Sequence, residues 1–202
     1  MTPDLVPDLA IAMKAKIKAV CDTNSDPLIL SPDIHRYHAQ YALFLEQAAR
    51  IEDADAEMLA LAVYGWMPTI MRTFNYDRLG SEVVSGGLRV LRSARPDDAF
   101  SLLCKMDRTA AVNHSWVGTS KFLHFLNPHV FPIWDSRVAR AVGIKSYKLN
   151  RRQTYTAYLE AIHQIATYDA VTTVQQRLEA SLRAKLSRIR AIELCLFVSG
   201  KR

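Results

Sequence analysis

Apolar residues recur every three or four positions along most of the chain, which is the spacing that gathers them on one face of an α-helix. Residues 30–51 show this clearly, because Tyr41 and Phe44 repeat at that spacing between polar residues. Ser31 suits an N-cap, and Pro32 suits the first helical position, where its missing N–H is not needed. We therefore expect a helix that begins at Pro32.

Turn-forming residues divide the next part of the chain. Residues 53–74 predict a helix with acidic residues in its first turn, as the helix dipole favours, and with a break or kink near Gly65 and Pro68. Residues 81–94 contain a Gly-Gly pair in their middle, which predicts a weak or broken helix. Residues 95–108 predict a helix that is entered through a proline and carries acidic residues at its positive end.

Two longer apolar stripes follow towards the C-terminus. The first runs from Tyr155 to Ala166 and the second from Val171 to Ile189, with Asp169 suited to an N-cap between them. The second stripe predicts one helix whose basic residues point mostly towards solvent, namely Arg177, Arg183, Lys185, Arg188 and Arg190. No segment alternates between apolar and polar residues as a half-buried strand does. The pattern therefore predicts an all-α, compact multi-helix fold, with residues 1–202 forming a single helical domain.

Composition agrees with a globular protein that buries a core. Hydrophobic residues make up 50% of the 202 residues and charged residues 23%. No apolar run approaches the roughly 18 residues that a membrane span requires, so we expect no membrane association. Cys21, Cys104 and Cys195 are odd in number and lie within apolar patterns. They indicate buried thiols in a reducing environment, and we expect a cytoplasmic protein.

The charges are distributed unevenly between the two halves. Residues 1–100 contain 10 Lys and Arg against 14 Asp and Glu, a net charge of −4, whereas residues 101–202 contain 16 against 6, a net charge of +10. This contrast suggests an acidic helical lobe and a basic one with a cleft between them, and the basic half suits a polyanion. Solvent-exposed helix faces would account for the same charges without a partner.

The motifs of several common enzyme classes are missing. The segment VVSGGLRV lacks the spacing and the trailing Lys-Ser/Thr of a phosphate-binding loop, and the chain has no His-Glu-x-x-His, Cys-x-x-Cys or Gly-x-Ser-x-Gly motif. The spacing of His114, His124 and His129 does not place all three on one helix face. Such histidines more often hydrogen-bond within a fold. We therefore expect no metal site.

The segment SWVGTSKFLHFLNPHVFPIWDSRVARAVG, residues 115–143, carries the strongest candidate chemistry. We expect a tight turn around Gly118 and a helix that opens at Lys121 and ends before Pro128. The helix dipole and burial among aromatic residues would both disfavour the ammonium form of Lys121, which is how an amine becomes a nucleophile at neutral pH. Asp135 would N-cap the following helix, and the two side chains could converge on one pocket.

The order GTSK … FPIWDSRV resembles the helix-hairpin-helix DNA glycosylases, and especially their 8-oxoguanine glycosylase branch. The resemblance covers about 30 of the 202 residues. It implies an all-α fold that binds DNA and excises a flipped, damaged base. Lys121 would match the nucleophile that forms a Schiff base at the sugar C1′, and Asp135 the carboxylate that assists departure of the base. A bifunctional member would then nick the strand by β-elimination, without a metal or an organic cofactor.

Further residues of the basic half complete this hypothesis. The residues that bind the flipped base would be Trp116, Gly118, Phe131 and Trp134, of which the three aromatic ones would form the wall against which it stacks. The residues that grip the nucleic-acid backbone would be Ser120, Arg137, Arg140, Lys145, Lys148, Arg151 and Arg152.

Structural explanations stand beside each of these assignments. Aspartate before Ser-Arg-Val is a common N-cap, and the aromatic residues of this segment are more often core than base clamp. The alternative function is a non-catalytic helical adaptor or nucleic-acid-binding protein of a mobile-element or defence system. The enzyme requires the Lys121 amine and the Asp135 carboxylate to face one open cleft, whereas the adaptor permits the lysine to lie in bulk solvent.

Overall fold

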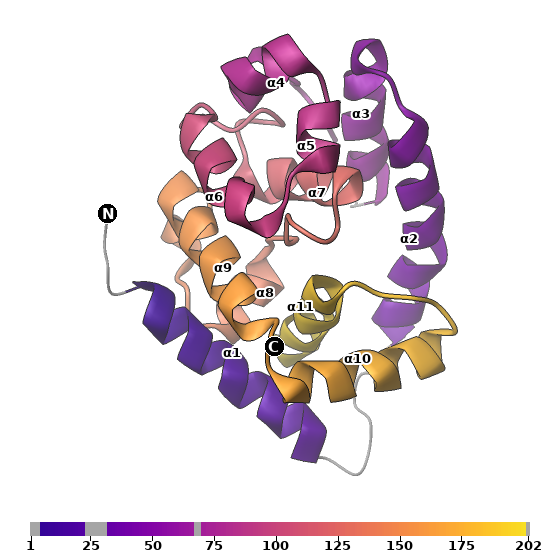
Figure 1. Ribbon diagram of the computed structural model, residues 1–202, viewed down its shortest axis with the longest axis vertical. Helices are drawn as coiled ribbons and strands as arrows, with labels where there is room; N and C mark the ends of the chain where they lie inside the picture. Colours follow the sequence, from indigo (N-terminus) through magenta and orange to yellow (C-terminus); the bar gives the residue numbers. More distant parts are fainter. Residues whose placement is uncertain (1–4, 23–31, 67–69, 201–202) are drawn as a thin grey trace.

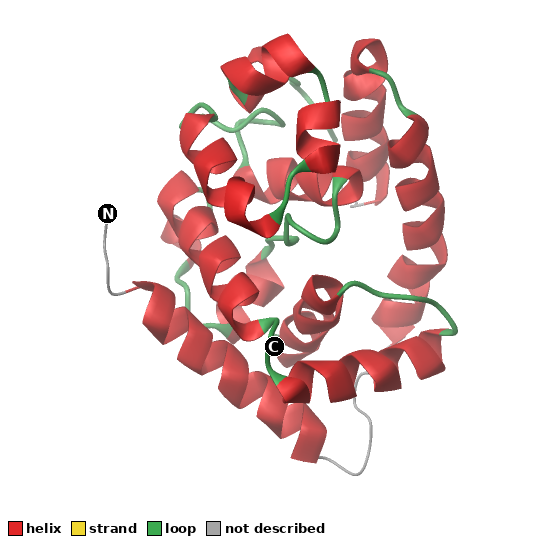
Figure 2. Cartoon of the chain, viewed as in Figure 1, coloured by secondary structure: helices red, strands yellow, loops and turns green. Residues whose placement is uncertain are grey.

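The computed structural model describes residues 5–22, 32–66 and 70–200, and these residues form helices joined by loops (Figure 2). The helices in chain order are α1 (Leu5–Asp22), α2 (Pro32–Arg50), α3 (Ala56–Trp66), α4 (Ser81–Gly86), α5 (Arg89–Ser93), α6 (Pro96–Lys105), α7 (Trp116–Leu126), α8 (Ser136–Ala141), α9 (Arg152–Ile165), α10 (Asp169–Leu182) and α11 (Arg188–Ser199). Short 3-10 helices lie at Asp53–Asp55, Tyr76–Leu79 and Ser146–Lys148. Within the described residues there is no β-strand, only one isolated bridge between Phe74 and Val112. The predicted all-α class is confirmed.

The N-terminal helix packs with the C-terminal helices. α1 lies along α9 and also contacts α10 and α11, while α7 packs against α2, α3 and α5 (Figure 1). The helices of the acidic first half are therefore shared between two ends of the molecule. This arrangement differs from a division into lobes at about residue 100.

Helix α7 is the buried centre of the fold. Every residue from Gly118 to Leu126 is buried, including Lys121. A helix that is apolar on all sides belongs in the interior, and α7 fits that description apart from a few polar residues. Gly118 permits close packing here, because a Cβ at this position would lie 2.6 Å from Cε2 of Tyr64.

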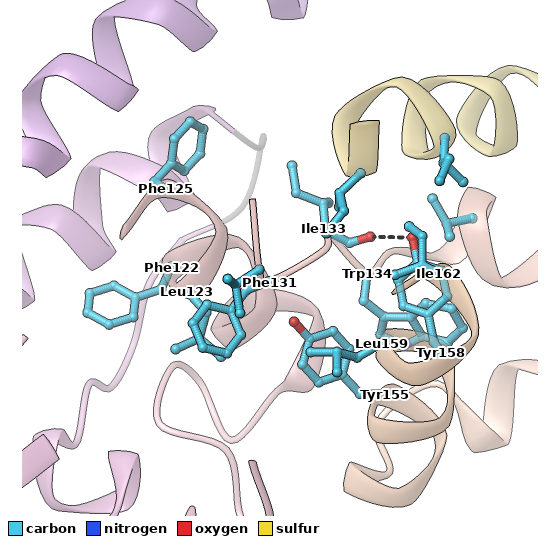
Figure 3. Packing of buried hydrophobic residues seen from close by; sticks show 14 of the residues in the cluster. Phe122, Leu123, Phe125, Phe131, Ile133, Trp134, Tyr155, Tyr158, Leu159 and Ile162 are labelled. Carbon is cyan, nitrogen blue, oxygen red and sulfur yellow. Dashed lines mark hydrogen bonds between the residues drawn. The ribbon is translucent and has the colours of Figure 1, made fainter. Parts of the chain in front are cut away.

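The connection from α7 to α8 is extended and buried, as predicted. Trp134 packs against Tyr158 with ring centroids 4.8 Å apart. The Tyr155 hydroxyl donates to the Pro132 carbonyl (3.0 Å), and the Tyr158 hydroxyl donates to the Ile133 carbonyl (3.2 Å; Figure 3). These hydrogen bonds satisfy backbone groups that have no helical partner, and they fix the segment that leads to Asp135.

Several predicted helix boundaries are confirmed. α2 begins at Pro32, while Ser31 lies outside the described residues. α3 ends at Trp66, one residue after Gly65, and Pro68 again lies outside the described residues. The Gly-Gly pair separates α4 from α5, and α6 begins at the predicted proline.

The start of α7 was predicted wrongly. The helix begins at Trp116, so Gly118 is helical and Lys121 lies in its second turn instead of its first. The tight turn comes earlier, where Asn113 and His114 adopt left-handed backbone angles (φ 50° and 53°). The Asn113 side chain stabilises this turn, because its oxygen accepts from the backbone N–H groups of Arg72 and Thr73.

The expected single helix over residues 171–189 is also wrong. α10 ends at Leu182, Arg183 adopts a left-handed conformation (φ 53°), and α11 begins at Arg188. Asp169 is the first residue of α10 and Tyr168 its cap. The break turns α11 inwards, so that Arg190 is buried and does not face solvent as expected.

The expectation of three buried thiols holds only in part. Cys195 is buried, Cys21 is half-buried and Cys104 is exposed. Of the helices that the structure describes, none is long and apolar enough to cross a bilayer.

Candidate active site

A cavity of about 350 Å³ lies between α7, α8 and α11, and residues of α2 and α3 complete its wall. Lys121 and Asp135, the two candidate catalytic residues predicted from the sequence, both line it. Its other lining residues are Ile34, Tyr37, Trp66, Val117, Ile133, Ser136, Arg137, Val138, Leu149, Arg190, Glu193, Leu194 and Phe197. Ser136 is exposed, which places the mouth of the cavity at the start of α8.

Lys121 is the buried amine of this cavity, with 5% of its surface exposed. Within the described residues it makes no hydrogen bond or ion pair. Burial lowers the pKa of Lys121 from 10.5 to about 8, while the nearby carboxylates of Asp135 and Glu193 oppose this effect. Burial, one of the two effects that the sequence suggested, is thus the main cause of the lowered pKa. With this pKa about a tenth of the amine is neutral and nucleophilic at pH 7, and about half at pH 8.

Asp135 N-caps α8, as predicted. Its Oδ1 accepts hydrogen bonds from the backbone N–H groups of Arg137 and Val138, both at 2.8 Å. Within the described residues its Oδ2 has no hydrogen bond, although the side chain lines the cavity. Asp135 can therefore be both an N-cap and a ligand-binding residue, because Oδ1 caps α8 and Oδ2 is available to a ligand.

Arg190 and Glu193 form a buried ion pair that also lines the cavity, with 6% and 1% of their surfaces exposed. Arg190 Nη1 lies 3.1 Å from Glu193 Oε2, and Glu193 Oε1 accepts from the backbone N–H of Ile133. Burial raises the pKa of Glu193 from 4.5 to about 7, against the lowering effect of Arg190. This carboxyl therefore changes its charge close to neutral pH.

His124 and Tyr41 are neighbours of this ion pair in the core. Burial lowers the pKa of His124, so the ring is neutral, and its Nδ1 lies 2.8 Å from the Phe131 carbonyl, which can only accept. Nδ1 therefore carries the proton, and Nε2 accepts from the Tyr41 hydroxyl at 2.7 Å. The guanidinium of Arg190 lies over the Tyr41 ring, 4.6 Å from its centroid. The hydrogen bond to His124 holds the Tyr41 ring, and the Tyr41 ring in turn fixes the position of the Arg190 guanidinium.

The four residues predicted to contact the base are buried in the core and are not among the residues that line this cavity. Trp116 stacks on Tyr155 and donates to the Arg108 carbonyl, and Trp134 donates to the Leu149 carbonyl. Phe131 is fully buried, and Gly118 packs against Tyr64. The aromatic residues that do line the cavity are Tyr37, Trp66 and Phe197.

Two of the predicted backbone contacts have structural roles instead. The Ser120 hydroxyl is fully buried and joins α7 to the connection, donating to the Val117 carbonyl and accepting from the Trp134 N–H, both at 3.0 Å. It cannot reach a nucleic-acid backbone. Arg152 donates to the carbonyls of Cys104 and Met106, so it joins α9 to the end of α6.

The other predicted backbone contacts lie closer to the surface. Arg137 lines the cavity over the Phe197 ring (4.5 Å), and Arg140 is exposed and donates to the Gly200 carbonyl (2.6 Å). Lys145 and Arg151 are exposed and Lys148 is half-buried. Lys148 and Arg151 flank Tyr147, which has 63% of its surface exposed.

The histidines do not form a metal site. His124 is buried, whereas His114 and His129 are exposed. Across the part of the chain that the structure describes, no three His, Cys, Asp or Glu side chains are grouped as metal ligands would be.

Sequence reasoning missed Arg190 and Glu193 as site residues. The available signal was the segment IRAIELCLFV, residues 189–198, in which a single carboxylate follows an arginine by three positions within an apolar run. Charged residues in such a run are rarely buried unless they are paired or functional.

Comparison of the chain with models of known protein families, with curated proteins and with solved structures finds no significant match. The function must therefore be inferred from the cavity and its side chains.

Proposed function

We propose that the protein is a DNA glycosylase-like enzyme in which Lys121 attacks the sugar of an everted nucleotide and Asp135 assists. The observation that carries this proposal is the buried Lys121 amine, with a pKa of about 8, in one cavity with the Asp135 carboxylate. A buried amine without a partner among the described residues destabilises a fold, so a functional reason for it is required. The adaptor hypothesis supplies no such reason.

The size and the walls of the cavity support a planar ligand. Its volume of about 350 Å³ falls at the lower end of the roughly 300–1,000 Å³ typical of small-molecule sites. Tyr37, Trp66 and Phe197 line it, and flipped bases commonly stack against such aromatic side chains. The mouth at Ser136 lies at the start of α8, next to Arg137, whose side chain also lines the cavity.

The residues present supply each step of the reaction. The neutral Lys121 Nζ forms a bond to C1′ as the glycosidic C1′–N bond breaks, and the electron pair of that bond leaves with the base. Asp135 accepts the proton lost by the attacking nitrogen, and this proton can pass to the departing base. The carboxylate also stabilises positive charge that develops on the sugar. Ring opening gives a Schiff base, and β-elimination from it would expel the 3′ phosphate.

Borohydride trapping tests this proposal. A duplex with one abasic site presents the aldehyde directly, and borohydride reduces the resulting Schiff base to a stable covalent adduct. We expect an adduct with the wild-type protein and none with Lys121→Ala. Lys185→Ala is the matched control, because its side chain is 95% exposed on another part of the surface, and it should form the adduct normally. Absence of an adduct with the folded wild-type protein would overturn the proposal.

A further inference from the structure

The Arg190–Glu193 ion pair is the most unusual feature of the cavity that the proposed reaction does not use. Both side chains come from α11, and both are almost completely buried. A buried ion pair rarely stabilises a fold more than well-packed apolar residues would. Its place in the cavity wall therefore points to a role in binding.

The surroundings of the pair leave part of its hydrogen-bonding capacity unused. Glu193 receives one hydrogen bond at each oxygen, from Ile133 and from Arg190, and a carboxylate oxygen can accept a second. The Nε–H of Arg190 is buried and has no acceptor among the described residues. A buried donor without an acceptor destabilises the protein until an acceptor arrives.

The other residues that line the cavity indicate what kind of ligand carries this acceptor. Beside the pair lie Trp66, Leu194 and Phe197, which offer apolar and aromatic surface. A few polar groups in a largely apolar cavity determine the orientation of a ligand. The cavity thus suits a flat heterocycle whose polar edge meets Arg190 and Glu193.

We propose that Arg190 and Glu193 bind the pairing edge of the everted base, with the guanidinium donating to a ring nitrogen or carbonyl and the Glu193 carboxylate accepting from an adjacent N–H. This inference rests on the proposed function. It defines the substrate class as bases whose pairing edge keeps one donor beside one acceptor. Bases methylated on that edge are excluded, because the methyl group removes the N–H donor of hypoxanthine or uracil, or the N1 acceptor of adenine, and leaves the buried charges unsatisfied.

Free bases test the edge recognition by competing with the borohydride trapping of an abasic duplex. The probes are three pairs: hypoxanthine and 1-methylhypoxanthine, adenine and 1-methyladenine, uracil and 3-methyluracil. We expect at least one parent base to inhibit trapping at a concentration at least about tenfold lower than its methylated partner. Arg190→Lys keeps the positive charge beside Glu193 but removes the Nε–H, and it should reduce this ratio towards one. Arg188→Lys, an exposed change on the same helix, should retain the wild-type ratio.

The outcomes separate the two proposals. Absence of wild-type trapping refutes the proposed function, and the edge recognition with it. Trapping that no parent base inhibits, or that parent and methylated bases inhibit equally, refutes the edge recognition alone. If Arg190→Lys fails to fold, the ratio of inhibiting concentrations measured with the wild-type protein still tests the edge recognition. Glu193→Gln, which alters the acceptor and preserves its size, provides a second variant in which the ratio should fall.

Discussion

Replacement of Lys121 by methionine should stabilise the protein while it removes the nucleophile. Methionine has a similar length and carries no charge, so the cavity wall keeps its shape. The pKa of Lys121 is lowered from 10.5 to about 8, and each pKa unit corresponds to about 1.4 kcal/mol. At pH 7, where the folded protein must hold a buried ammonium group, Lys121→Met should therefore raise the free energy of unfolding by about 3 kcal/mol.

The pH dependence identifies the cause of this difference. Between pH 8 and pH 10.5 the unfolded chain binds a proton at Lys121 and the folded protein does not. The stability of the wild type therefore rises with pH across this window, relative to the variant. Above pH 10.5 the amine is neutral in both states, and the advantage of Lys121→Met should disappear.

Urea denaturation of both proteins, followed by tryptophan fluorescence between pH 7 and pH 10.5, measures this directly. Other titrating groups contribute almost equally to both proteins, and Glu193 is ionised throughout most of the window, so the difference isolates Lys121. A difference that stays constant over the whole window would show that the amine is solvated in the folded protein. The lowered pKa of Lys121, on which its proposed reactivity depends, would then be refuted.

Further predictions concern the pH dependence of trapping, the Asp135 cap and the Gly118 packing. Trapping of the abasic duplex should accelerate about tenfold for each pH unit below 8 and level off above it, because the neutral fraction of Lys121 grows in that way; a flat profile would contradict the lowered pKa. Asp135→Asn should keep the N-cap and the stability of the protein. It should reduce the rate of base release at least about a hundredfold. The pH dependence of trapping should also shift to lower pH, because Asp135 raises the pKa of Lys121 in the wild type. Asp135→Ala should also lose about 1 kcal/mol of stability in chemical denaturation, and equal stability of the two variants would contradict the cap. Gly118→Ala should destabilise the fold by about 1–3 kcal/mol in thermal or chemical denaturation, because its Cβ would meet the Tyr64 ring. Gly65→Ala is the control with open space around it and should stabilise α3 by about 1 kcal/mol.

Periodicity and turn residues were enough to predict the all-α class and several helix boundaries. Pro32 and the Gly-Gly pair between α4 and α5 act through local backbone geometry, which a single sequence expresses directly. The start of α7 was misplaced because Gly118 suggested a turn. Its small size instead serves a tertiary contact with Tyr64, and Asn113 and His114 make the turn without glycine.

The candidate site was predicted only where local chemistry determines it. Asp135 caps a helix and Lys121 reaches the same cavity, and both followed from one segment. The aromatic wall could not be inferred from that segment, because Tyr37, Trp66 and Phe197 come from three distant helices. The apolar stripe predicts one helix over residues 171–189, and this places Arg190 on its solvent-facing side. The left-handed Arg183 breaks that helix and turns α11 inwards.

The most direct test of the central claim is to locate the covalent bond. After borohydride reduction with the abasic duplex, digestion of the protein and DNA followed by mass spectrometry identifies the modified amine. We expect one modified peptide, with the sugar remnant on Lys121. A remnant on another lysine or on the N-terminal amine, with Lys121 unmodified, would contradict it.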